Sequence, residues 1–151
     1  MGSKCPECGA SWDGDHTCQD DFYQMLFWEA EDPRRGEVHH LTVLCYHLQH
    51  PSRYSPDGLV YAQQLLVNFV QEGAAPQEVR KQKRDQVDSG RRSWKVTSRS
   101  GARGVYTHPV RWTMTAADVV AAGAEAYCES VRAWAQSILV ALRELGNSQP
   151  E

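Results

Sequence analysis

The sequence predicts a mainly α-helical fold, a helical bundle of about four helices with a metal-binding loop at its N-terminal end. Three observations predict it. Apolar residues recur at helical spacing over several long segments, two Thr-x-x-Asp capping boxes mark helix starts, and three cysteines lie within the first 18 of 151 residues. With 41% hydrophobic and 23% charged residues, the chain has the composition of a globular protein. We expect one domain.

Four parts are expected within this single domain. They are a metal loop over residues 1–17, a helical core over 18–73, a basic and partly irregular insertion over 76–112, and a long C-terminal helix over 115–146. The boundaries fall where helical periodicity stops at glycine, proline or a run of charge.

Three helices are expected in the helical core, over about 18–31, 37–49 and 56–73. The second helix should end before Pro51, because the residue before a proline avoids helical geometry. The third should begin at Pro56, a residue favoured at the first helical position.

The C-terminal helix is predicted from the capping box of Thr115 and Asp118 and from a regular apolar stripe. The stripe alternates spacings of four and three residues, which is typical of a helix packed lengthwise in a bundle. We therefore expect one continuous helix, in a monomer or, through a coiled coil, in a homodimer. The stripe consists of Val120, Ala124, Tyr127, Val131, Trp134, Ile138, Ala141 and Leu145.

The insertion is strongly basic, with nine of the sixteen basic residues between positions 80 and 103. Residues 93–107 could pair as a small β-hairpin or form an irregular loop, and both remain open. Trp94 and Tyr106 could stack on bases, so nucleic-acid binding through residues 80–103 is one hypothesis. The formal net charge of −3 and nine carboxylates in the first 37 residues argue against it.

The chemistry of the chain is concentrated in the motif Cys5-Pro6-Glu7-Cys8-Gly9. Two thiolates at this spacing, in a turn set by proline and glycine, can wrap a tetrahedral metal ion, and Cys18 supplies a third thiolate. Five cysteines without an export signal do not suit a disulfide framework, so we expect Zn²⁺. A redox-active pair is the alternative, disfavoured because no βαβ unit surrounds it. Cys45 and Cys128 lie in apolar helical patterns and should be buried.

The fourth ligand is expected from the histidines near the second helix. If that helix runs antiparallel to the first, its C-terminal end returns beside Cys18, whereas His39 lies nearly three turns away. His50 is therefore the favoured ligand, with His16, His47 or water as alternatives. The predicted metal site is Cys5, Cys8, Cys18 and His50.

The second helix has two faces at 100° per residue. Its core stripe is Leu41, Leu44, Cys45 and Leu48, and the opposite face carries His39, Val43, Tyr46 and His50. We expect this second face to lie under the cysteine loop, with His39 and Tyr46 as a buried hydrogen-bonded pair. His40 is expected in solvent, and His108 in a turn before Pro109.

Cys-Pro-x-Cys-Gly and the segment His39-x-Leu41-Thr42-Val43-x-x-Tyr46-x-x-Gln49-His50-Pro51 resemble a family of small uncharacterised bacterial proteins, a domain of unknown function. The late His108-Pro109 and the helix start over residues 115–119 add to the resemblance. It implies a metal site at the matched positions and no particular reaction. The basic insertion departs from the family pattern.

Three functions follow as hypotheses. The first is a cytoplasmic helical protein whose structural zinc supports binding to an unknown protein partner. The second is a zinc-dependent hydrolase with an open metal site, in which His39, Tyr46 or His108 would move protons. The third is nucleic-acid binding. Whether the protein is an enzyme stays open, but three thiolates disfavour ionised metal-bound water, so a non-enzymatic role is favoured. We expect no membrane segment, because no apolar run reaches the required length.

Overall fold

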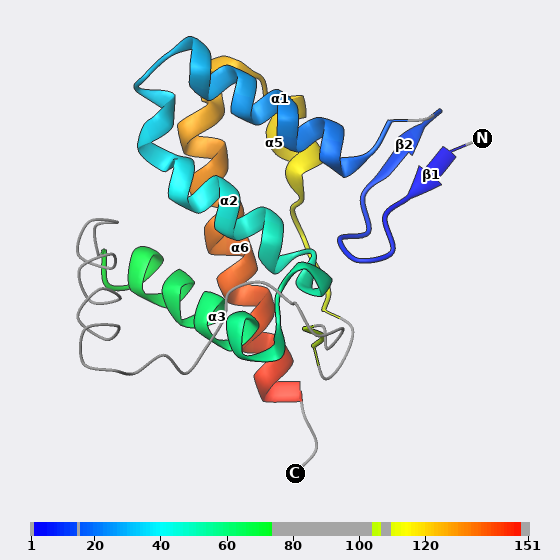
Figure 1. Cartoon of the computed structure of the whole chain (residues 1–151), viewed down its shortest axis with the longest axis vertical. Coiled ribbons are helices and arrows are strands. Elements are labelled where there is room, and N and C mark those ends of the chain that lie inside the picture. Colours follow the sequence, from blue (N-terminus) through cyan, green and yellow to red (C-terminus); the bar gives the residue numbers. More distant parts are fainter. Residues whose placement is uncertain (1, 15, 74–103, 107–109, 149–151) are drawn as a thin grey trace. The chain divides into compact units, whose positions relative to one another are not determined.

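The computed structural model describes residues 2–14, 16–73, 104–106 and 110–148 (Figure 1). The fold is mainly helical, which confirms the predicted fold class. The predicted hairpin over 93–107 falls almost wholly outside the described residues.

The chain divides into two compact units. One unit comprises Met1–His50 with Thr107–Glu151, and the other comprises Pro51–Tyr106. The single domain with four parts stays a prediction.

The first unit begins with a two-stranded antiparallel hairpin. β1 (Gly2–Lys4) pairs with β2 (Ser11–Asp13), and Lys4 lies opposite Ser11. The sequence predicted a metal-ordered loop without strands here, because strands of three residues are too short to show a periodic pattern. The turn between these strands carries the first two cysteines.

The first two helices follow the hairpin. α1 (Cys18–Glu31) starts at the predicted residue, with the capping box between Thr17 and Asp20 present. α2 (His39–Leu48) begins two residues later than predicted, because a 3₁₀ turn, η1 (Arg35–Val38), precedes it.

α2 runs back along α1. Cys18, at the start of α1, lies beside His50, just beyond the end of α2. Glu29, near the end of α1, lies beside His39, at the start of α2. The antiparallel arrangement expected from the short connection is therefore confirmed (Figure 1).

The predicted continuous C-terminal helix is wrong, because the chain forms two helices. α5 (Ala116–Ala122) ends at Gly123, and a 3₁₀ turn, η3 (Ala124–Ala126), leads into α6 (Tyr127–Ser148). Gly123 has φ +93° and ψ 165°, a backbone conformation that cannot continue a helix and that only glycine adopts readily. The alternating spacing of apolar residues continues unchanged across this break, so the spacing did not predict it.

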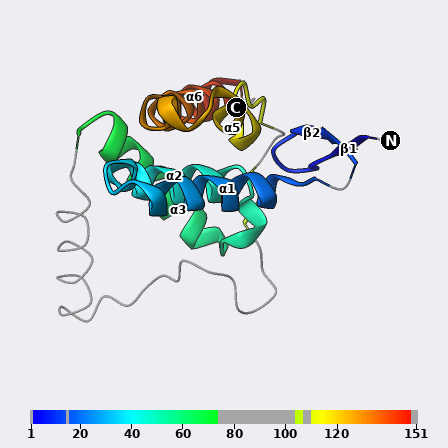
Figure 2. The same ribbon diagram turned by 90° about the horizontal axis from the view of Figure 1, so that it is seen from above.

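The core of the first unit lies between two layers of helices. Figure 2 shows α5 and α6 in one layer and α1 and α2 in the other, with α5 packed on α1 and α6 packed on α2. Met25 of α1 is fully buried in this core. The predicted α2 stripe is buried, as are five members of the predicted C-terminal stripe: Tyr127, Val131, Trp134, Ile138 and Ala141.

The second unit is built on α3 (Pro56–Val70), which Ser55 caps by accepting a hydrogen bond from the Gly58 amide. A 3₁₀ turn, η2 (Pro51–Arg53), precedes it. Gly104 returns to this turn, where a Cβ atom would lie 2.7 Å from the Pro51 carbonyl oxygen. Among the described residues, no helix is both long and apolar enough to cross a membrane.

Gly123 offers a direct test of the break between α5 and α6. We expect Gly123→Ala to lower the free energy of unfolding by about 1–3 kcal/mol, because alanine must adopt a conformation that only glycine tolerates. An added Cβ would meet no atom within 4 Å at Gly123 or at Gly36, so steric crowding does not contribute. Gly36→Ala, at a residue without positive φ, is the matched control. Equal urea midpoints for the two variants would contradict the backbone argument.

Candidate metal centre

The cysteine motif forms a tight turn closed by backbone hydrogen bonds. The Gly9 amide donates to the Cys5 carbonyl at 2.9 Å, and the Cys5 amide donates to the Ala10 carbonyl at 2.9 Å. Gly9 has φ +81°, which explains the glycine at this position. The Cys8 amide points at the Cys5 sulfur at 3.5 Å, so the turn supplies an N–H group to a metal-binding thiolate.

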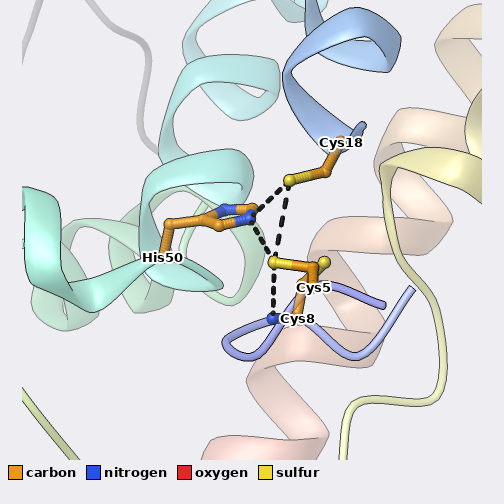
Figure 3. Close-up of side chains that lie close together, drawn as sticks. All are labelled: Cys5, Cys8, Cys18 and His50. Atoms are coloured by element: carbon orange, nitrogen blue, oxygen red, sulfur yellow. Dashed lines mark hydrogen bonds between the residues drawn. The ribbon is translucent and has the colours of Figure 1, made fainter. Parts of the chain in front are cut away.

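Three separate elements bring four donor side chains together (Figure 3). Cys5 and Cys8 come from the hairpin turn, Cys18 is the first residue of α1, and His50 follows α2. The three sulfurs and a ring nitrogen of His50 all lie within 4.8 Å of one another. These are the four residues predicted from the sequence.

The distances among the donor atoms of Cys5, Cys18 and His50 are close to those of a tetrahedral site. Zn–S bonds of about 2.3 Å and a Zn–N bond of about 2.0 Å imply sulfur–sulfur distances of about 3.8 Å and sulfur–nitrogen distances of about 3.5 Å. The Cys5 and Cys18 sulfurs are 3.7 Å apart. The His50 Nε2 atom lies 3.5 Å from the Cys5 sulfur and 3.1 Å from the Cys18 sulfur. The group could therefore hold a metal ion, and ligation itself stays a prediction.

The orientation of His50 suits a metal ligand. Its Nδ1 atom lies 2.6 Å from the Tyr46 carbonyl oxygen, which can only accept, so Nδ1 carries the hydrogen. Nε2 is then free to offer its lone pair toward the sulfurs. The Tyr46 ring stacks on Phe22 with a centroid distance of 4.2 Å and lies 4.3 Å from the His50 ring. This aromatic packing fixes the imidazole.

Hydrogen bonds within the group shift the pKa values of its members in different directions. The hydrogen bond from Cys8, with a further one from His50, lowers the pKa of Cys18 to about 3 despite burial. The same bond to Cys18, together with burial, raises the pKa of Cys8. Burial opposes the charged form of His50, but hydrogen bonds to Cys18 and to the Tyr46 carbonyl raise its pKa to about 9. A cation that binds all four residues must displace these protons, so its affinity should fall at low pH.

The alternative ligands lie outside this group. His16 contacts Asp21 at 2.7 Å between Nε2 and Oδ1, and the indole N–H of Trp12 donates to the other oxygen of Asp21 at 3.0 Å. Asp21 is buried, so it ties the hairpin to α1. The hydrogen bond to Asp21 raises the pKa of His16. His47 is half-buried, with its ring 6.3 Å from that of Phe22.

The expected buried pair of His39 and Tyr46 is wrong. Tyr46 is buried near the metal centre, whereas the His39 side chain is 55% exposed and its Nδ1 lies 2.6 Å from a Glu29 oxygen. At 100° per residue, His39 and Tyr46 lie on the same face of the helix. His39 is the first residue of α2, however, and this end of the face is not buried. His40 is half-buried, not in solvent, and burial lowers its pKa. His108 lies outside the described residues.

A buried polar network near His39 is not apparent from the sequence. The Tyr127 hydroxyl donates to Glu29, whose side chain is only 8% exposed, and lies 2.8 Å from the Thr42 hydroxyl. Burial and the neighbouring Glu29 carboxylate raise the pKa of Tyr127. Tyr127 falls within the predicted apolar stripe and Thr42 on neither predicted face of its helix, so helical periodicity does not reveal that their hydroxyls meet.

The network gives a second stability test. We expect Tyr127→Phe to lower the free energy of unfolding by about 1–3 kcal/mol, because Glu29 and Thr42 each lose a buried partner. Tyr23→Phe is the control, since Tyr23 is exposed and a change there should stay within about 0.5 kcal/mol. Urea denaturation compares them. A loss no larger for Tyr127→Phe than for Tyr23→Phe would contradict the network's role.

An open cleft of about 770 Å³ adjoins the candidate metal centre. The hairpin turn forms one wall, including Cys5 and Cys8, and residues 110–118 contribute the other. The indole N–H of Trp112 donates to the Glu7 carbonyl at 3.1 Å, which joins the two walls. One side of the centre therefore faces solvent through this cleft.

The fold and this site define a mainly helical protein with a candidate three-cysteine, one-histidine metal centre. Residues 3–143 match the model of the Family of unknown function (DUF5946), and the chain belongs to that family. The match agrees with the resemblance to a domain of unknown function, although it does not test the individual motifs. Neither the curated proteins nor the solved structures contain a match to this chain.

Proposed function

We propose that this protein binds one zinc ion through Cys5, Cys8, Cys18 and His50, and that the zinc holds the N-terminal hairpin against α1 and α2 as part of a macromolecular interaction module. The single observation that carries the proposal is the convergence of four donor atoms within 4.8 Å from three separate elements. A zinc ion would cross-link these elements and so contribute folding free energy.

A structural role is favoured over a hydrolytic one by the donor set. Four protein ligands fill a tetrahedron and leave no position for a reactive water. Three thiolates also place much negative charge on the metal, which disfavours ionisation of bound water. His39, one of the residues considered for proton transfer, lies at the opposite end of α2 from His50 and contacts Glu29.

The proposed interaction role rests on the N-terminal hairpin, which the zinc would stabilise. The hairpin is small, since its two strands contain three residues each, and so short a hairpin is marginal without support. The zinc would fix this hairpin beside the open cleft, and a partner protein could be recognised there. The basic segment lies outside the described residues and adds no support for nucleic-acid binding.

Metal analysis joined to hydrogen exchange tests the proposal. The purified protein should contain about one zinc per chain, and removal by a chelator should increase amide exchange in the hairpin and the first turn of α1. Exchange in the middle of α6 should change less, because its apolar face is buried in the helical core. Absence of zinc, or zinc removal without faster exchange in the hairpin, would contradict the structural role.

A further inference from the structure

The three cysteines of the candidate centre differ in their access to solvent. Cys8 and Cys18 are buried, with 4% and 9% of their surface exposed, whereas Cys5 is half-buried. Cys5 also lines the open cleft beside the hairpin turn. A small solute that enters the cleft would therefore reach Cys5 more readily than Cys18.

Cys5 contacts each of the other three residues of the group (Figure 3). Its sulfur lies 3.7 Å from the Cys18 sulfur and 3.5 Å from His50 Nε2. Two sulfurs this close can form a bond with only a small movement of their side chains, provided that one of them is oxidised. Cys18 is thus well placed to attack an oxidised Cys5.

We propose that Cys5 is an oxidative modification site for small hydroperoxides, and that its reaction forms a Cys5–Cys18 disulfide and releases the zinc. This inference rests on the proposed zinc site. Zinc would keep both sulfurs as thiolates, the form that reacts with peroxides. Loss of two of four ligands would leave only Cys8 and His50, too few to retain the ion.

The reaction balances with hydrogen peroxide as the oxidant. The Cys5 thiolate attacks one peroxide oxygen, a sulfur–oxygen bond forms, the oxygen–oxygen bond breaks, and the departing hydroxide takes a proton to give water. The Cys18 thiolate then attacks the Cys5 sulfur, the disulfide forms, and the sulfur–oxygen bond breaks. The second hydroxide also takes a proton. Two thiolates, one peroxide and two protons thus give one disulfide and two waters.

The pairing has a structural consequence. A Cys5–Cys18 disulfide would join the hairpin turn to the start of α1, as the zinc does, but it would free His50 and therefore the end of α2. Oxidation would thus release one of the three elements that the zinc cross-links and keep the other two joined. A Cys5–Cys8 disulfide would instead free the hairpin from both helices.

The test uses the zinc-loaded, full-length protein and hydrogen peroxide. Zinc release is followed with a colorimetric chelator, and the disulfide is mapped by mass spectrometry after cleavage at acidic residues. Glu7 separates Cys5 from Cys8, and Asp13 separates Cys8 from Cys18. We expect one zinc released per Cys5–Cys18 disulfide, and recovery after a dithiol reductant and zinc are added. Cys128→Ser is the control and should release zinc at the same rate.

A second variant isolates the first step. Cys18→Ser removes the attacking thiol, so Cys5 sulfenic acid should accumulate and be trapped by dimedone; if this variant does not fold, the disulfide map of the unmodified chain decides. A Cys5–Cys8 or Cys8–Cys18 disulfide, or zinc retention in excess peroxide, would overturn the inference. Purification without zinc would instead overturn the proposed zinc site itself.

Discussion

Cys8→Ser should abolish stoichiometric zinc binding and lower the free energy of unfolding by more than about 4 kcal/mol, an effect typical of the loss of a structural metal. Cys8 is buried in the hairpin turn. When its thiolate is removed, no solvent-exposed group is expected to take its place as a ligand. Zinc content after dialysis and urea denaturation in the presence of zinc measure the two effects.

Cys128→Ser is the matched control for Cys8→Ser. Cys128 is half-buried and its sulfur lies 3.6 Å from the Arg34 carbonyl, outside the candidate metal centre. It should retain full zinc content, with a much smaller change in stability. Full zinc occupancy in Cys8→Ser would remove Cys8 from the ligand set, whatever the stability of the variant.

His50→Ala and His39→Ala form the second large contrast. The two histidines lie at opposite ends of α2. His50 lies among the sulfurs just beyond its last residue, whereas His39 is its first residue and contacts Glu29. His50→Ala should weaken zinc binding and stability together, because a closed tetrahedral site loses one of four ligands. His39→Ala should keep its zinc and lose at most about 1–3 kcal/mol of stability.

Titration of both histidine variants against a competing chelator compares their zinc affinities. If His39→Ala lost zinc and His50→Ala kept it, the ligand assignment on α2 would be wrong. If neither substitution changed the affinity, His50 would not be a ligand, and a water in its place would make the open coordination of a hydrolase the better account.

The candidate site was predictable because its signals are local and directional. The Cys-x-x-Cys turn, the capping box at Thr17 and the short connection between the first two helices each have one dominant structural outcome. Together they placed His50 beside Cys18, 32 residues away in the chain. These three signals set the course of the backbone, and none of them required the conformation of a distant side chain to be known.

The missed features depend on backbone conformation or on packing between distant residues. Nothing in the apolar stripe showed that Gly123 would adopt a positive φ and divide the last helix. The contact of Tyr127 with Glu29 joins residues 98 positions apart, and helical periodicity does not record such polar partners. His39 is exposed because it lies at the very start of α2. Its angular position around the helix axis could not predict this exposure.

X-ray absorption spectroscopy of the purified, metal-loaded protein tests the central claim most directly, because it counts the sulfur and nitrogen ligands around the metal. The proposed zinc site predicts three sulfurs at about 2.3 Å and one imidazole nitrogen at about 2.0 Å. A first shell with two sulfurs or with a coordinated water oxygen, or a preparation that binds no zinc, would contradict the closed site of Cys5, Cys8, Cys18 and His50.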